Sequence, residues 1–224
     1  MVKILPMFPL GTVVLPGGVL PLHVFEPRYR EMVRVCLDGD REFGVVLISR
    51  GSEVGGGDVR NDVGTVVRMV QVAELADGRF AMITVGMSRF RVVSWLEDDP
   101  YPQALIDEWP DEPATECSAG TEQASADQLL VPLTARVRRL VALSVELGDS
   151  VDDPGQELSD EPVAATYQLA TLAPLSVADR YALLAIPGVD ERLTCLGSIL
   201  DDVEAALTFR LHAETPSVDP PAPW

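Results

Sequence analysis

Lysine is nearly missing from this chain: Lys3 is the only one among 224 residues, and arginine supplies the rest of its 17 basic residues. A phosphate-binding loop needs a lysine beside the β- and γ-phosphates. The glycine-rich run Gly51–Asp58 has none, so it predicts a hairpin loop. The GxSxG pattern of serine hydrolases is also missing, and Ser88 in GMSRF, which we expect in a hairpin turn, has no base nearby in the sequence.

Cysteine is scarce as well, with three widely separated residues, Cys36, Cys117 and Cys195, and no CxxC pair. This pattern is typical of free thiols in a reducing cytoplasm, and a zinc site completed by His23 or His212 is not expected. No apolar run reaches the roughly 18 residues of a membrane span. The proline-broken N-terminus lacks the pattern of a secretory signal. We therefore expect a cytoplasmic protein with no metal, cofactor or membrane contact.

Acidic charge lies mostly in the second half of the chain. Up to Pro110 there are 11 basic and 15 acidic residues, a net −4, whereas the remainder carries net −14 of the total −18. An acidic surface repels phosphate, so nucleic acid is not an expected partner. The charge by itself indicates solubility and self-repulsion.

Prolines divide the apolar segment from Met7 to Tyr29, MFPLGTVVLPGGVLPLHVFEPRY, into short strands and turns. Pro16-Gly17-Gly18 predicts a turn, and Val19 to Phe25 predicts the next strand. The period then changes to that of a helix starting at Pro27, whose apolar residues follow at i, i+3, i+4 and i+7: Tyr29, Met32, Val33 and Cys36.

This order of residues resembles the N-terminal, substrate-binding domain of Lon proteases, in the form that occurs as a stand-alone protein. The resemblance continues through FGVVLI, GSEVG, VGTVVRMVQV and GMSRFRVVSW, and later through PVAATYQLATLAPLSVADRYALLAI. It implies a PUA-like β pseudo-barrel and a non-catalytic role in binding unfolded or extended protein segments, with a protease or a chaperone as a further partner. Lon cleaves peptides with a serine–lysine pair after an ATPase module, and this sequence cannot form that pair.

The residue pattern agrees with an α+β fold. Short strands, a turn at Ala76-Asp77-Gly78 and one early helix predict a small β pseudo-barrel over residues 1–110. Residues 111–126 are polar and predict a linker, and residues 127–212 predict a C-terminal α-helical bundle. Its helices are expected from about Leu129, at Val163–Leu172, at Val177–Ala185 after a capping box, and from Asp190 to about Leu211, with Pro132 near a first turn. Residues 213–224 predict a disordered tail.

The candidate substrate-binding residues lie mainly around the strand-to-helix junction: Leu15, Leu22, His23, Phe25, Glu26, Arg28, Tyr29 and Arg89. Glu26 is expected to accept from the helix N-terminus and to pair with Arg89 or Arg91, or else to contact a ligand. We expect His23 to be a packed strand residue and not a general base, because Glu26 is the only nearby residue that could be its partner in catalysis.

The apolar candidates have two interpretations. Phe8, Leu15, Leu22 and Phe25 are expected in the core, and the alternative is that strand residues near the prolines line an apolar groove for unfolded peptide. Three functions stay open: a protein-binding module, which we favour, a small-molecule or nucleic-acid binder using the barrel, and an enzyme. The sequence predicts neither the clients nor the oligomeric state.

Overall fold

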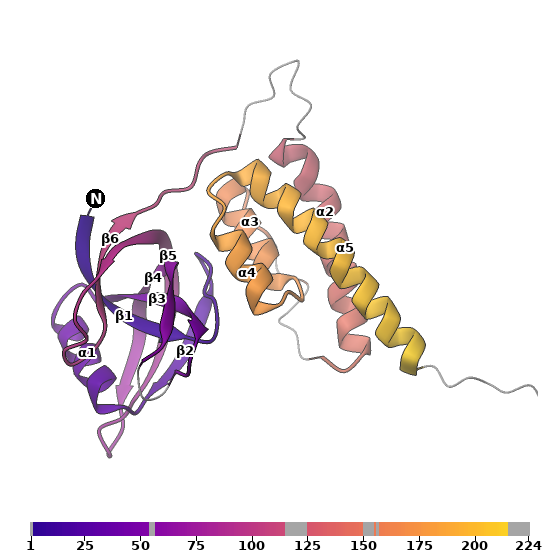
Figure 1. Cartoon of the computed structure of the whole chain (residues 1–224). Helices are drawn as coiled ribbons and strands as arrows, with labels where there is room; N and C mark the ends of the chain where they lie inside the picture. Colours follow the sequence, from indigo (N-terminus) through magenta and orange to yellow (C-terminus); the bar gives the residue numbers. More distant parts are fainter. Residues whose placement is uncertain (1, 54–56, 115–124, 150–154, 156, 215–224) are drawn as a thin grey trace, which may run out of the picture.

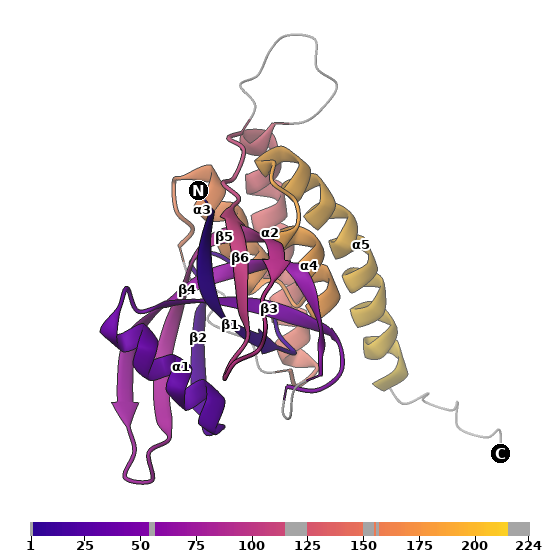
Figure 2. The ribbon, with the colours of Figure 1, turned by 60° about the vertical axis from the view of Figure 1, so that its left-hand side comes forward.

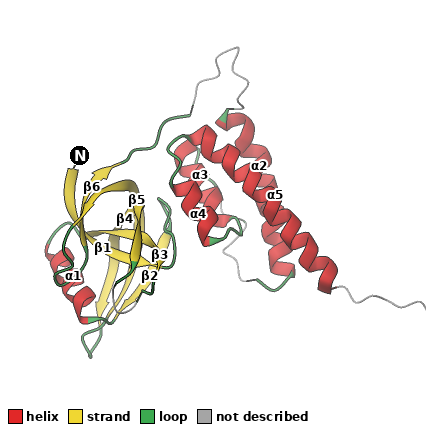
Figure 3. Ribbon diagram, viewed as in Figure 1, coloured by secondary structure: helices red, strands yellow, loops and turns green. Residues whose placement is uncertain are grey.

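The structure, a computed structural model, describes residues 2–53, 57–114, 125–149, 155 and 157–214. Strands and one helix form the N-terminal part, and the remaining helices form the C-terminal part (Figures 1 and 3). This arrangement confirms the predicted α+β fold. Residues 213 and 214 of the expected tail at 213–224 lie in the last helix, which ends at Glu214, and the rest of that tail and most of the expected linker lie outside the described residues.

Five of the six strands close into a ring. Their order is β5-β4-β3-β1-β6, with a further pairing of β6 with β5, and only β1 and β3 run parallel. Long β4 and β5 bend at bulges, which lets each pair with different neighbours along its length. The strands are β1 (Val2–Leu10), β2 (Val19–Val24), β3 (Glu42–Arg50), β4 (Val59–Glu74), β5 (Phe80–Trp95) and β6 (Gln103–Glu108).

The ends of β4 and β5 extend past the ring as a hairpin, and β2 adds to this extension. The predicted turn at Ala76-Asp77-Gly78 joins β4 to β5, with Gly78 at φ 76°. Helix α1 (Pro27–Asp38) begins at the predicted proline and buries the four predicted apolar residues. Figure 2 shows α1 lying along the extension.

Four helices follow: α2 (Ala126–Glu146), α3 (Pro162–Leu172), α4 (Val177–Leu184) and α5 (Val189–Glu214). The predicted capping box at the start of α4 is present, since Ser176 Oγ accepts from Asp179 N at 3.2 Å. Pro132 was expected in a first turn but lies inside α2, which starts earlier at Ala126. The described part of the chain contains no helix long and apolar enough to cross a membrane.

The two parts share one apolar core. Val13 and Leu15, from the loop after β1, are buried in the same cluster as the inner faces of the four helices, and Leu47 and Val63 of the ring pack against it. The sequence resolves the two parts as separate patterns, but in space the helices rest on one side of the ring.

Candidate functional site

An apolar surface lies on the outer side of the β2–β5–β4 extension. Cross-strand pairing aligns Pro21 with Ile83 and His23 with Ala81, and β4 continues the row through Gln71, opposite Ile83. Side chains directly opposite each other on antiparallel strands form one continuous face. We call the surface made by Pro21, His23, Gln71, Ala73, Ala81 and Ile83 the outer sheet face; it borders a hollow of about 440 Å³.

The opposite side of the same strands is core. Leu22, Val24, Phe80 and Met82 alternate with the outer residues and pack with α1 in one buried cluster. Alternation along a strand sends successive side chains to opposite faces, so α1 covers one face only. The outer residues of β2 stay exposed, and Val19 has 65% of its surface accessible.

A second hollow of about 420 Å³ adjoins the outer sheet face where β2 begins. Its walls come from the two parts of the molecule: the turn before β2 with Val19 and Pro21 on one side, and Gln168, Thr171 and Leu172 of α3 on the other. We call it the interdomain cleft. Since Pro21 lines both hollows, the cleft and the outer sheet face form a continuous surface along β2.

This surface is uncharged apart from one histidine. None of the residues lining the two hollows is an aspartate, glutamate, lysine or arginine. The strip is only partly apolar, because Gln168 and Thr171 line the cleft beside Val19 and Leu172. Exposed apolar side chains gathered on one surface are typical of a surface that binds other proteins.

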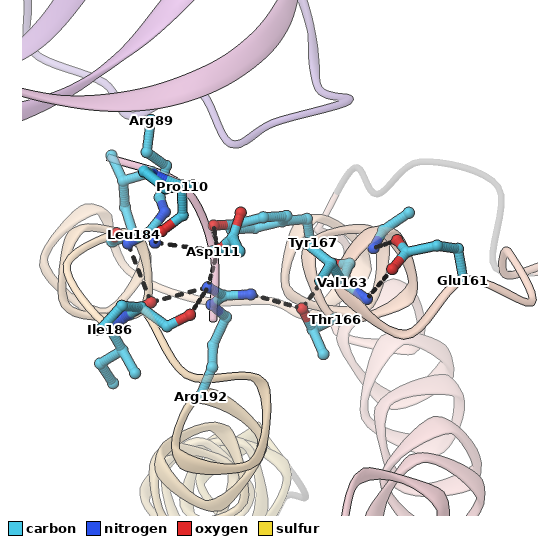
Figure 4. A network of polar contacts seen from close by, with 12 residues as sticks. Arg89, Pro110, Asp111, Glu161, Val163, Thr166, Tyr167, Leu184, Ile186 and Arg192 are labelled. Carbon is cyan, nitrogen blue, oxygen red and sulfur yellow. Dashed lines mark hydrogen bonds and ion pairs between the residues drawn. The ribbon is translucent and has the colours of Figure 1, made fainter. Parts of the chain in front are cut away.

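A buried polar network fixes the helices against the ring and so sets the position of the cleft wall (Figure 4). Asp111 Oδ1 accepts from Tyr167 Oη at 2.6 Å and pairs with Arg89 Nη2 at 3.1 Å. Arg192 pairs with the same carboxylate oxygen and donates to Thr166 Oγ1 at 2.9 Å. We call Arg89, Asp111, Tyr167 and Arg192 the interdomain clasp.

Arg89 reaches from β5 into the helical part. It donates through Nη1 to the carbonyl oxygens of Leu184 and Ile186 at 3.0 and 3.1 Å. Burial lowers the pKa of Arg89 and raises the pKa of Tyr167. The clasp therefore holds two buried guanidinium groups on one carboxylate. Backbone carbonyls accept from their Nη atoms, while Nε of Arg89 and of Arg192 is buried without a hydrogen-bond partner among the described residues.

Most of the candidate residues from the sequence do not meet at one surface. Leu15 is buried between ring and helices, and Leu22 and Tyr29 are buried under α1, where burial raises the pKa of Tyr29 to about 12. Arg89 belongs to the clasp. Of the eight, His23 alone lines the outer sheet face.

Three expectations near the junction were wrong. Phe25 is 53% exposed instead of being core. Glu26 pairs with Arg28 at 3.1 Å and its side chain caps no helix N–H, whereas Arg89, one of its two expected partners, pairs with Asp111. Ser88 lies within β5 and not in a turn. Gly86, also within β5, is required because a Cβ there would lie 2.4 Å from the Leu15 carbonyl oxygen.

The sequence interpretation missed Val19, Pro21, Ala81 and Ile83. Their signal was available: Val19, Pro21 and His23 share one side of a strand whose other side is Leu20, Leu22 and Val24. The α3 residues of the cleft gave no such signal, because nothing in the sequence places Gln168 beside Pro16.

Comparison with known proteins agrees with this architecture. Residues 4–202 match the profile of the family described as the ATP-dependent protease La (LON) substrate-binding domain. The chain is 29% identical over 163 residues to Lon protease 2 of Myxococcus xanthus, covering 68% of this chain and 19% of that protein. It is 28% identical over 213 residues to Lon protease 2 of Herpetosiphon aurantiacus, covering 94% and 25%. The chain thus spans only a fifth to a quarter of these relatives.

Solved structures are similar over most of the chain. The crystal structure of a Lon N-terminal domain protein from Xanthomonas campestris has a TM-score of 0.63 and 28% identity, and the match covers 88% of this chain and 98% of that one. The N-terminal domain of the Mycobacterium avium complex Lon protease, at 21% identity and a TM-score of 0.57, shows the fold alone.

Proposed function

This chain belongs to the family of the ATP-dependent protease La (LON) substrate-binding domain, and we propose that it is a non-catalytic module that binds exposed apolar, extended segments of other proteins. The observation that carries this proposal is the uncharged strip formed by the outer sheet face and the interdomain cleft. Unfolded chains display the apolar side chains that folded proteins bury, so such a strip suits them.

The contacts of the charged clasp residues support a binding role over a catalytic one. Arg89, Asp111 and Arg192 each already have partners in the described structure. Catalysis by a general base would need a titratable group aimed into a cleft with a second group beside it. His23 is among the residues that line the two hollows, but none of the other lining residues is an aspartate or a glutamate that could act with it.

A nucleic acid or an anionic small molecule is a less suitable ligand. Phosphate recognition relies on lysine and arginine, and the strip has neither. The net charge of −18 adds repulsion at longer range. We therefore keep protein segments as the proposed ligand class.

Binding to a permanently unfolded protein tests the proposal. The fluorescence anisotropy of labelled, reduced and carbamidomethylated lysozyme, a basic protein, should rise on titration with this protein, and that of the native, disulfide-bonded form, which has the same charge, should not. Val19→Asp should weaken binding at least about tenfold, because it places a charge in the strip where apolar contact is lost. Val93→Asp is the matched control, since Val93 is 56% exposed on β5 but lines neither hollow.

Both variants should unfold at the temperature of the parent protein, because both valines are exposed. If the two variants bind the unfolded protein with equal affinity, the strip is not the binding surface. No binding of the unfolded protein by the parent chain would refute the proposed function itself.

A further inference from the structure

Strand β2 has one edge paired and one edge open. It is the last strand in the sheet order, and within the described residues it pairs with β5 alone. Gly86 N donates to Gly18 O at 2.9 Å, which fixes the phase of the antiparallel ladder. In such a ladder every second residue points its backbone groups at the partner strand. Leu20, Leu22 and Val24 therefore face β5, and Val19, Pro21 and His23 present their backbone groups on the open edge.

The open edge of β2 carries one of the usual protections against pairing, a proline. Proteins guard edge strands with charged residues, prolines, bulges or covering elements. The segment VLPLHV has no charged residue, and the pairing of β2 with β5 is regular from Val19 to Val24. Pro21 removes a single donor and leaves its carbonyl oxygen available. Val19 and His23 keep both a donor and an acceptor for an added strand.

The surroundings of this edge suit an extended segment of another protein better than a second copy of this chain. The interdomain cleft begins beside the edge, with α3 as its far wall, so the space next to Val19 is a slot. A second copy would have to bring its own walled β2 into this slot. Each copy also carries a net charge of −18, which opposes self-association.

We propose that the segment bound by this protein is held as an added β-strand along the open edge of β2, hydrogen-bonded to the backbone of Val19, Pro21 and His23. This inference rests on the proposed function and specifies how the ligand is recognised. Main-chain hydrogen bonds would give affinity without regard to sequence, and alternate side chains of the segment would lie against the outer sheet face. The ligand class is then an extended segment, neutral or basic, with apolar residues at alternate positions.

Two backbone-modified peptides test the mode of binding. The probe is a labelled synthetic peptide that alternates valine with threonine and has lysine at each end. One version is N-methylated at the valines and the other at the threonines. Only one edge of an added strand meets β2, so one version should bind at least about tenfold more weakly than the unmodified peptide while the other binds within about twofold. Equal binding by the two versions would overturn strand addition.

A pair of variants tests the same point in the protein. His23→Pro removes the outward amide and the imidazole, whereas His23→Ala removes the imidazole alone. Pro is tolerated where the amide faces away from the sheet, as at Pro21, so both variants should keep the parent circular dichroism spectrum. His23→Pro should bind the unmodified peptide at least about tenfold more weakly than His23→Ala. Equal affinities of the two variants would contradict the inference.

The outcomes separate this inference from the proposed function. If Val19→Asp weakens binding of carbamidomethylated lysozyme but the two N-methylated peptides bind equally, the strip binds through side chains and only strand addition fails. If light scattering shows a dimer that His23→Pro dissociates and His23→Ala does not, the edge pairs with a second copy, and the inference is overturned. If neither the peptide nor the unfolded protein binds to the parent chain, the proposed function is refuted, and the inference that rests on it is refuted with it.

Discussion

Replacing Asp111 by asparagine tests whether the interdomain clasp holds the two parts of the molecule together. The side chains of Arg89 and Arg192 are 0% and 1% exposed, and Asp111 is the carboxylate that both of them contact. Asparagine keeps the shape of the side chain and removes its charge. Two guanidinium groups would then lie in the interior without a counter-charge, and removing one partner of a buried ion pair costs about 3 to 5 kcal/mol.

We expect the lower end of that range, about 3 kcal/mol, since water can approach a partly exposed carboxylate and screen the loss. The Asp111 side chain retains 17% exposure. Urea unfolding should be followed by far-UV circular dichroism and by tryptophan fluorescence. Trp109 is a local reporter, because the Cζ atoms of Arg89 and Arg91 lie 4.3 and 3.3 Å from its ring centre.

Asp201→Asn is the matched control. Asp201 lies 2.6 Å from Arg136, but its side chain is 72% exposed, and exposed ion pairs contribute about 0 to 1 kcal/mol. In the parent protein the two probes should report one transition, and in Asp111→Asn they should separate. If Asp111→Asn and Asp201→Asn unfold at the same urea concentration, the clasp does not hold the parts together and the reasoning is refuted.

Three further expectations follow from named contacts. Phe25→Ala should lower the free energy of unfolding by about 1 kcal/mol or less, because the ring is 53% exposed; a loss of about 3 kcal/mol in urea unfolding would restore the core assignment. Burial is the largest single influence on Asp58 and opposes its ionisation, but the hydrogen bond from Arg60, a backbone hydrogen bond and the charges of Arg60 and Arg28 together outweigh it, so the pKa of Asp58 is lowered. The folded pKa of Asp58 then lies below the unfolded value of about 3.9, so its ionised form stabilises the fold above that pH, and this stabilisation is lost as the pH falls. In a plot of the urea midpoint of unfolding against pH, Asp58→Asn should therefore show a smaller decrease at acid pH than the parent protein. Brief subtilisin digestion should first cut within residues 111–126 and leave a folded fragment 1–110, and a first cut in β4 or β5, read by mass spectrometry, would contradict this boundary.

Local patterns predicted the elements but not their neighbours. The proline at the start of α1 and its apolar residues at i, i+3, i+4 and i+7 were sufficient for that helix, and Ser176 with Asp179 was sufficient for the start of α4. Helix starts depend on contacts within one turn, so a short stretch of sequence contains them. The ring depends on pairings such as β1 with β6, about one hundred residues apart, and for these the family resemblance was needed.

At the candidate site, too, the sequence did not show which residues are buried or which lie next to each other. Phe25 was assigned to the core because it is aromatic and lies between a strand and a helix. Phe25 follows directly after β2, which ends at Val24, and its exposure continues the alternation in which Val19, Pro21 and His23 face outward. Arg89 bonds to carbonyl groups 95 and 97 residues away, and a sequence pattern cannot assign a partner at that separation.

Strand β5 and helix α3 each carry one part of the strip and one part of the clasp. On β5, Ile83 lines the outer sheet face and Arg89 enters the helical part. On α3, Tyr167 bonds to Asp111 while Thr171, one turn later, lines the cleft and donates to the Tyr167 carbonyl at 2.8 Å. The clasp and the cleft wall are therefore one helical turn apart on a rigid element. We therefore expect a change that loosens Asp111 to move this wall relative to β2, so that the buried ion network, remote from the proposed ligand, would influence the width of the slot that receives it.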